Sequence, residues 1–122
     1  MANILENLTI LAVEDVEKSR SFYIDQLGFH EYLRTNGWSF LNRGSLYLRV
    51  GHCPGIVPMT GCQDHSLIIQ ANVDDANEMY EEFKSRGVDV SKPEDKPWGY
   101  REFGVVTPDG HRFMFTEALE AK

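Results

Sequence analysis

The spacing of apolar residues in the first half of the chain predicts strands and one helix. Residues 9–13 (TILAV) have the composition of a short strand. Residues 16–27 then follow a helical period, with Asp15 as a good N-cap and Gly28 as the glycine that ends the helix. Strand-like runs separated by turn residues follow at 29–35, 38–41 and 46–50.

The second half shows the same kinds of pattern after residues 51–64, which are rich in Gly and Pro and have no period. Residues 66–73 alternate as in a strand. Asp74 and Asp75 then precede a helical period that ends at Gly87. Further strands are predicted at 88–90, 100–106 and 112–116, with a loop at 91–97 and a Pro-Asp-Gly turn at 108–110.

The two halves repeat each other in pattern and length rather than in residue identity. The N-cap aspartate and the terminating glycine have the same separation in both, Asp15 to Gly28 and Asp74 to Gly87. We therefore expect an α+β fold of two tandem βαβββ modules, whose curved mixed sheets enclose a cleft. The chain would be a single domain over 1–122, with modules at about 4–51 and 65–118 and a linker at 52–64.

Composition restricts the classes of partner. The chain has 122 residues, with 12 Lys and Arg against 19 Asp and Glu and a net charge of −7, so it would repel nucleic acid and anionic membranes. This charge suits a cationic ligand, although acidity also serves solubility alone. The first apolar run, 8–13, has no basic region before it and is too short for a signal peptide or a membrane helix. With only Cys53 and Cys62, we expect a cytoplasmic protein with free thiols, a disulfide across the loop being the alternative.

Several segments resemble a known superfamily. The segment VEDVEKSRSFYIDQLGF at 13–29 resembles the first strand-helix unit of the vicinal oxygen chelate superfamily, which includes glyoxalase I, extradiol dioxygenases, and fosfomycin and bleomycin resistance proteins. PWGYREF at 97–103 and TPDGHRF at 107–113 are similar to the closing strands of the bleomycin resistance branch. The resemblance covers nearly the whole chain and implies the glyoxalase/bleomycin resistance fold, a ligand cleft and a homodimer.

In the metalloenzymes of this superfamily, four strands each supply one metal ligand. The corresponding positions here are Leu8, Leu48 or Arg49, His65 and Met114. Only His65 carries a metal-binding side chain, whereas a zinc, nickel, manganese or iron site needs at least three protein ligands. We therefore expect no metal and no cofactor, and we expect His65 either to contact a ligand or to cap the start of its strand.

Aromatic residues in the predicted strands are candidates for stacking on a planar or cationic ligand. Trp38, Phe40 and Tyr47 lie in alternating runs, and they either line the cleft or fill the core, since periodicity does not say which face is which. Arg49 either points into the cleft, where it would bind a carboxylate or stack on an aromatic group, or lies on a solvated edge. An inward Arg49 counts against a purely cationic ligand.

The segment 97–103 supplies further candidates. Trp98 is either a wall for a flat ligand or a packing residue on the protein's own surface. Glu102 either contacts a cationic ligand or forms a structural salt bridge, and Arg101 points to the other face because strand residues alternate. The full set of candidate ligand-binding residues is Trp38, Phe40, Tyr47, Arg49, His65, Trp98, Tyr100, Glu102 and Met114.

With the metal ligands missing, the resemblance implies a binding protein rather than an enzyme. It would sequester a small molecule, such as a planar or cationic antibiotic of the bleomycin type, without catalysis. One alternative is a glyoxalase- or dioxygenase-like metalloenzyme with an atypical metal site. Another is a housekeeping module that binds a metabolite.

Overall fold

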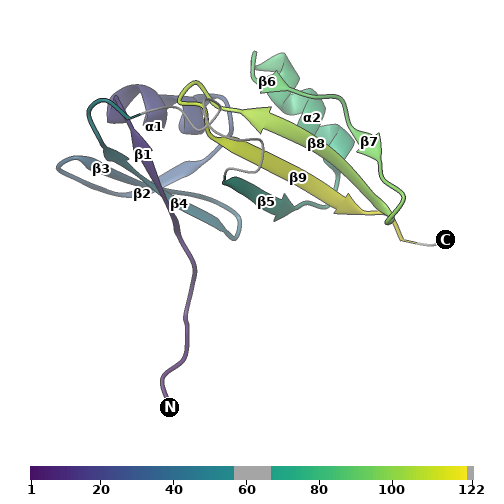
Figure 1. The fold of residues 1–122 in the computed structure, drawn as a ribbon, viewed down its shortest axis with the longest axis horizontal. Coiled ribbons are helices and arrows are strands. Elements are labelled where there is room, and N and C mark those ends of the chain that lie inside the picture. Colours follow the sequence, from purple (N-terminus) through teal and green to yellow (C-terminus); the bar gives the residue numbers. More distant parts are fainter. Residues whose placement is uncertain (57–66, 121–122) are drawn as a thin grey trace. The chain divides into compact units, whose positions relative to one another are not determined.

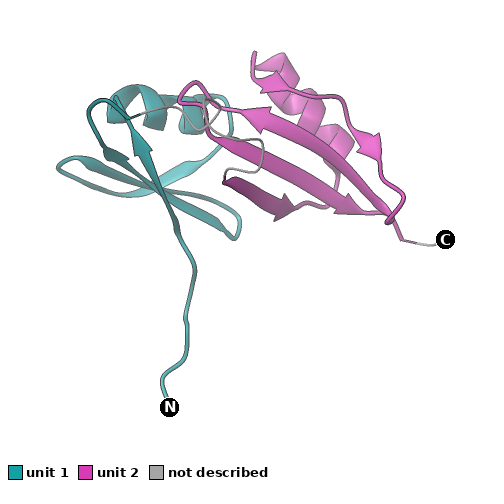
Figure 2. Ribbon diagram, viewed as in Figure 1, with its two compact units in different colours: residues 1–56 teal, residues 57–122 magenta. Residues whose placement is uncertain are grey.

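The computed structural model describes residues 1–56 and 67–120. These residues belong to two compact units, Met1–Ile56 and Val57–Lys122 (Figure 2). Cys62 and His65, both considered above, lie outside the described residues. Within the described ranges, no helix is long and apolar enough to cross a membrane.

The first unit is a four-stranded mixed sheet with one helix (Figure 1). Its elements are β1 (Thr9–Val13), α1 (Val16–Asp25), β2 (His30–Thr35), β3 (Trp38–Arg43) and β4 (Leu46–His52). The strand order is β1-β4-β3-β2, in which β1 pairs with β4 in parallel and the other pairs are antiparallel. Helix α1 contacts β2, β3 and β4, so one face of the sheet carries the helix and the other does not.

Alternate strand positions of this sheet form a core beneath α1. The sheet residues of that core are nearly inaccessible: Leu11, Val13, Leu41, Leu48 and Val50. From α1, Phe22 and Tyr23 are buried as well, and the ring of Tyr23 meets that of Phe29 edge-on at 5.4 Å. Side chains that alternate along the strands form one apolar face of the sheet, and side chains at helical spacing form one apolar face of α1. These two faces pack against each other.

The second unit is a five-stranded mixed sheet, again with one helix. Its elements are β5 (Ile68–Asn72), α2 (Ala76–Ser85), β6 (Asp89–Val90), β7 (Glu94–Asp95), β8 (Tyr100–Val106) and β9 (Arg112–Ala118). The order is β5-β9-β8-β6, with β7 also paired to β8. Under α2 the core is aromatic: the rings of Phe103 and Phe115 stack at 5.5 Å, and Phe83 of α2 meets Phe115 edge-on at 5.6 Å.

Both helices begin at predicted N-caps. The carboxylates of Asp15 and Asp75 each accept a hydrogen bond from a backbone N–H three residues later, at 3.1 and 3.0 Å. Gly28 and Gly87 follow the helices with φ values of 73° and 76°. Glycine adopts this left-handed conformation without a steric penalty because it has no Cβ. Helix α1 ends at Asp25, slightly before the predicted end at residue 27.

The predicted fold class is confirmed, with one correction in the second unit. Residues 91–97 were expected to be a loop, but Glu94 and Asp95 form β7 against β8. The carboxylate of Asp95 accepts hydrogen bonds from Arg101 at 2.6 and 3.1 Å, which lowers the pKa of Asp95. A strand of two residues between Pro93 and Pro97 is too short to show a period in the sequence.

The segment TPDGHRF forms the tight connection between β8 and β9. The backbone N–H of Thr107 donates to the carbonyl of His111 at 2.9 Å, and the Thr107 hydroxyl accepts from the His111 N–H at 3.0 Å. Gly110 supplies the left-handed conformation of the turn, with φ 85°. Burial lowers the pKa of His111, which favours the neutral ring. The two hydrogen bonds between Thr107 and His111 are the contacts by which this segment stabilises the hairpin.

A polar network joins α1 to the sheet of the first unit. Glu31 in β2 accepts two hydrogen bonds from Arg20 of α1, at 2.9 and 2.7 Å, and one from the hydroxyl of Ser39 in β3 at 2.5 Å. Arg20 is therefore partly buried against the sheet. The hydrogen bonds from Arg20 hold the pKa of Glu31 below its ordinary value.

Replacing Glu31 by Gln is expected to lower the free energy of unfolding at pH 7 by about 1–2 kcal/mol, because it removes charge-assisted hydrogen bonds. The folded pKa of Glu31 is depressed, so its stabilisation is complete above the ordinary glutamate pKa of about 4.3 and is lost as the pH falls through the folded-state value. Urea unfolding between pH 7 and pH 3 should show a flatter acid limb for the variant. Glu81→Gln, at an exposed position of α2, should unfold like wild type, and an unchanged acid limb in Glu31→Gln would contradict the prediction.

Candidate functional site

Alternation in β3 and β4 places four of the predicted ligand-binding residues on the sheet face opposite α1, the open face of the first unit. The neighbours that alternate with them are all buried on the helix side: Ser39, Leu41, Leu48 and Val50. The residues on the open face are half-buried: Trp38, Phe40, Tyr47 and Arg49. The structure therefore brings these side chains together and places none of them in the core under α1.

Arg49 lies among the rings on this face. Its guanidinium carbon is 4.5 Å from the ring centroid of Trp38 and 5.6 Å from that of Phe40, within the range of cation–π attraction. The strand register pairs Arg49 with Phe40 in β3 and with Ile10 in β1. The charged group thus lies against two aromatic rings, and an aliphatic residue is its cross-strand neighbour in β1.

Gly51 allows Trp38 to lie flat against β4. The two residues are cross-strand partners, and a Cβ at position 51 would stand 2.5–2.8 Å from three ring carbons of Trp38. Such contacts are far inside van der Waals distance, so any side chain at this position would push the indole away. The missing side chain at position 51 therefore makes the room that the Trp38 ring occupies.

Tyr32 also belongs to this face, although the sequence did not single it out. Its ring meets Phe40 at 6.0 Å and Tyr47 at 5.7 Å, both edge-on. In a regular hairpin closed by Asn36-Gly37, Tyr32 would pair with Leu41 on the core side. A β-bulge between Glu31 and Leu33 shifts the register, and it turns Tyr32 to the open face. We call the set Tyr32, Trp38, Phe40, Tyr47 and Arg49 the aromatic–arginine face.

The other described candidates lie in the second unit. Trp98 is 63% exposed and donates from its indole Nε1 to a carboxylate oxygen of Glu102 at 3.2 Å. Arg101 bonds Asp95 instead, so adjacent residues of β8 have different partners, as alternation requires. Of the two alternatives for Glu102, a structural salt bridge and contact with a cationic ligand, the described residues show no salt bridge, and its partner there is the Trp98 indole. Tyr100 is half-buried and two positions before Glu102, on the same side of the strand.

Met114 borders a hollow of about 320 Å³ in the second unit. It is the cross-strand partner of Gly104, whose missing side chain leaves room beside it. The backbone N–H of Gly104 donates to the hydroxyl of Ser91 at 2.8 Å at the rim of the same hollow. His65 lies outside the described residues, so its place is not assigned.

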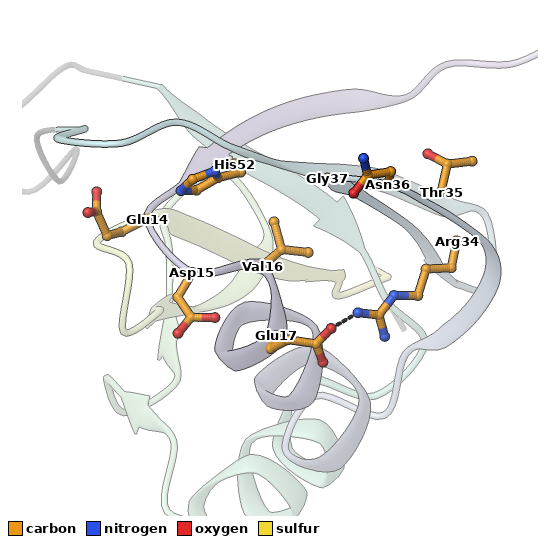
Figure 3. A pocket seen from close by; sticks show the side chains of 9 residues that line it. All are labelled: Glu14, Asp15, Val16, Glu17, Arg34, Thr35, Asn36, Gly37 and His52. Atoms are coloured by element: carbon orange, nitrogen blue, oxygen red, sulfur yellow. Dashed lines mark ion pairs between the residues drawn. The ribbon is translucent and has the colours of Figure 1, made fainter.

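A larger hollow of about 600 Å³ lies at the start of α1 (Figure 3). It is lined by Glu14, Asp15, Val16, Glu17, Arg34, Thr35, Asn36, Gly37 and His52. Its carboxylates are engaged in the fold: Asp15 caps α1, Glu14 accepts from the backbone N–H of Gly55 at 2.7 Å, and Glu17 pairs with Arg34. Because these carboxylates already have partners within the fold, we regard the aromatic–arginine face as the better candidate for a ligand site.

Comparison with known proteins adds the family. A sequence profile described as Glyoxalase/Bleomycin resistance protein/Dioxygenase superfamily matches residues 5–115. The chain belongs to this superfamily.

Individual relatives of the superfamily match along nearly the whole chain. The bleomycin resistance protein of Geobacillus stearothermophilus is 24% identical over 131 residues, which covers 96% of this chain and 99% of the relative. The structure of a bleomycin resistance determinant encoded on the transposon Tn5 superposes with a TM-score of 0.80 at 27% identity, over 94% of this chain and 98% of that one. A bleomycin-binding protein complexed with bleomycin gives 0.78 and 27%, over 93% and 98%.

The residues of this chain do not fit the metal site of the superfamily's metalloenzymes. Leu48 is buried under α1, so Arg49 is the residue that the fourth strand presents on the open face, and its charge would repel a metal cation. Leu8 and Met114 offer no hard donor at two further positions. Among residues 1–56 and 67–120, no three His, Cys, Asp or Glu side chains are grouped to hold a metal. His65 alone would supply one ligand, whereas such a metal site needs at least three from the protein.

Replacing Gly51 by Ala is expected to displace the indole of Trp38 from β4, because the new methyl group overlaps the ring. In a Trp98→Phe background, where Trp38 is the only tryptophan, its emission should shift to the red as the ring gains contact with water. The free energy of unfolding should fall by about 1 kcal/mol, since a partly exposed ring can swing aside at less than the cost of overpacking a core.

Gly104→Ala in the same background is the matched control. Its Cβ would come no closer than 3.4 Å to the Ser91 hydroxyl and touches no residue of the aromatic–arginine face. Its Trp38 emission should equal that of the background protein. Identical spectra for the two glycine variants would contradict the packing of Trp38 on Gly51.

Proposed function

We propose that this protein binds and sequesters a planar small molecule, in the manner of an antibiotic-binding protein, without changing it chemically. The observation that carries the proposal is the aromatic–arginine face, where four aromatic rings and one guanidinium gather on a sheet face that its own helix leaves open. Flat aromatic surfaces of this kind bind planar groups by offset or edge-on stacking and by burial of apolar area.

Relatives support a binding role. The curated relatives are bleomycin resistance proteins, and one structural neighbour is described as a bleomycin-binding protein complexed with bleomycin. At 24–27% identity these relatives do not fix the ligand of this chain. Because specificity comes from the few side chains that line a site, the ligand class is best argued from this chain's own residues.

Sequestration fits the residues better than metal-dependent catalysis. Leu8, Arg49 and Met114 stand where the superfamily's metalloenzymes place donors, and neither aliphatic, cationic nor thioether side chains suit a hard divalent ion. With no activated metal or cofactor, the protein's effect would depend on its affinity and on the number of binding sites per chain. A glyoxalase- or dioxygenase-like activity would need donors that these positions lack.

The proposal includes a cytoplasmic homodimer made of single-domain subunits. Each sheet in the described residues has a helix on one face only, and open apolar faces are stabilised when a second module covers them. In a homodimer, two such faces would enclose each ligand cleft. An acidic protein that holds a toxic molecule in the cytoplasm would protect a target there.

Titration of the purified protein with bleomycin and with other planar antibiotics tests this function. At least one should bind with a Kd in the micromolar range or below, measured by calorimetry. Trp38→Ala should weaken that binding about 10-fold or more, because a lost aromatic stack contributes roughly 1 kcal/mol beyond the buried area. Lys18→Ala, exposed on α1, should bind like wild type. Failure of every compound to bind below about 1 mM, or equal binding by the Trp38 variant, would refute the proposal.

A further inference from the structure

Arg49 differs from the other arginines of the first unit in its partners. Arg20 bonds the carboxylate of Glu31, Arg34 pairs with Glu17, and Arg43 donates to the carbonyl of Leu27 at 2.8 Å. Arg49 has no carboxylate or carbonyl partner among residues 1–56 and 67–120, and its contacts are the rings of Trp38 and Phe40. In a chain with a net charge of −7, carboxylates are plentiful, so a guanidinium without one on an apolar face is a distinctive feature.

The contacts of Arg49 leave its hydrogen-bond donors available. A guanidinium that lies over an aromatic ring uses its flat face, whereas its N–H groups point outward in the plane of the group. Those N–H groups match the two oxygens of a carboxylate as a fork. The side chains of the neighbours given by the strand register, Ile10 and Phe40, are hydrocarbon and could not accept these bonds. The donors are therefore free to meet an acceptor that a ligand brings.

The rings around Arg49 restrict the shape of that ligand. The guanidinium lies 4.5 Å from the Trp38 centroid and 5.6 Å from that of Phe40, and Tyr47 and Tyr32 continue the aromatic surface beside Phe40. A ring system that stacks on this surface would bring its edge to Arg49. A half-buried position also strengthens the attraction between opposite charges relative to water.

From this juxtaposition we infer that Arg49 is a specificity-determining residue, which makes the aromatic–arginine face select planar molecules with a carboxylate on the edge of the ring over neutral and cationic ones. The inference rests on the proposed function, because it concerns the ligand of the same face. It goes beyond that function by assigning the ligand's charge, which is opposite to what the acidic composition of the chain suggests. A purely structural Arg49, which only held Trp38 in place, would affect ligands of every charge equally.

Three ligands with the same ring system separate these roles: 2-naphthoate, 2-naphthamide and (2-naphthyl)methylammonium. They carry charges of −1, 0 and +1 on one aromatic frame. Calorimetry on the wild-type protein at low salt should give a Kd for naphthoate about 10-fold or more below that for naphthamide, the range expected for a charge-assisted hydrogen-bonded pair. The ammonium compound should bind most weakly, because it meets the guanidinium with a like charge.

Variants at position 49 provide the decisive comparison. Arg49→Met keeps an unbranched stem over the rings but has no charge, so its Kd values for naphthoate and naphthamide should agree within about 2-fold. Arg49→Lys keeps the charge without the planar fork and should retain part of the preference. Lys18→Met removes the same unit of charge from the exposed surface of α1, and it should leave the preference of the wild type unchanged.

Several results would overturn the inference. Equal affinity of the wild type for naphthoate and naphthamide would do so, as would a preference that survives in Arg49→Met or one that Lys18→Met abolishes. Failure of all three naphthalene compounds to bind would also count against it. If planar antibiotics bind while naphthoate has no advantage, only the charge assignment fails. If neither the antibiotics nor the naphthalene compounds bind, the proposed function fails with it.

Discussion

Among residues 1–56 and 67–120, each sheet is covered by a helix on one face only, and this one-sided packing governs the rest of the described structure. Because strand side chains alternate between faces, burial of Leu48 and Val50 under α1 forces Tyr47 and Arg49 to the other side. The core and the aromatic–arginine face are thus encoded in the same strands at alternate positions. A substitution on one face can change the core or the aromatic–arginine face with little direct effect on the other.

The distribution of charge follows the same division. In the first unit, Arg20 and Glu31 lie on the helix side, where Ser39 completes their hydrogen bonds and α1 is joined to the sheet. On the aromatic–arginine face the cation lies beside aromatic rings, and Arg49 has no carboxylate partner among the described residues. The overall negative charge of the chain therefore says little about the field that a ligand would meet, because local contacts outweigh distant, screened charges.

Alternation and capping made most of the fold predictable from the sequence. Which face of each sheet is buried could be assigned only from the position of the helix in the structure. The N-cap aspartates and turn glycines marked the element ends, since their chemistry is local. The pattern grouped Trp38 with Phe40 and Tyr47 with Arg49, but it could not say which side α1 covers, and both alternatives stayed open. Tyr32 was missed because a bulge interrupts the hairpin register, and β7 was missed because a two-residue strand depends on contacts with Arg101 rather than on its own pattern.

The bulge in β2 also has a consequence for how this surface can evolve. Glu31 is held by Arg20 and Ser39 on one side of the irregularity, while Asn36-Gly37 closes the hairpin on the other. The strand can therefore absorb a change of one residue in length between two fixed points. An insertion or deletion of one residue at the bulge of this edge strand would therefore change which side chain lies beside Phe40 without shifting the register of β3 and β4.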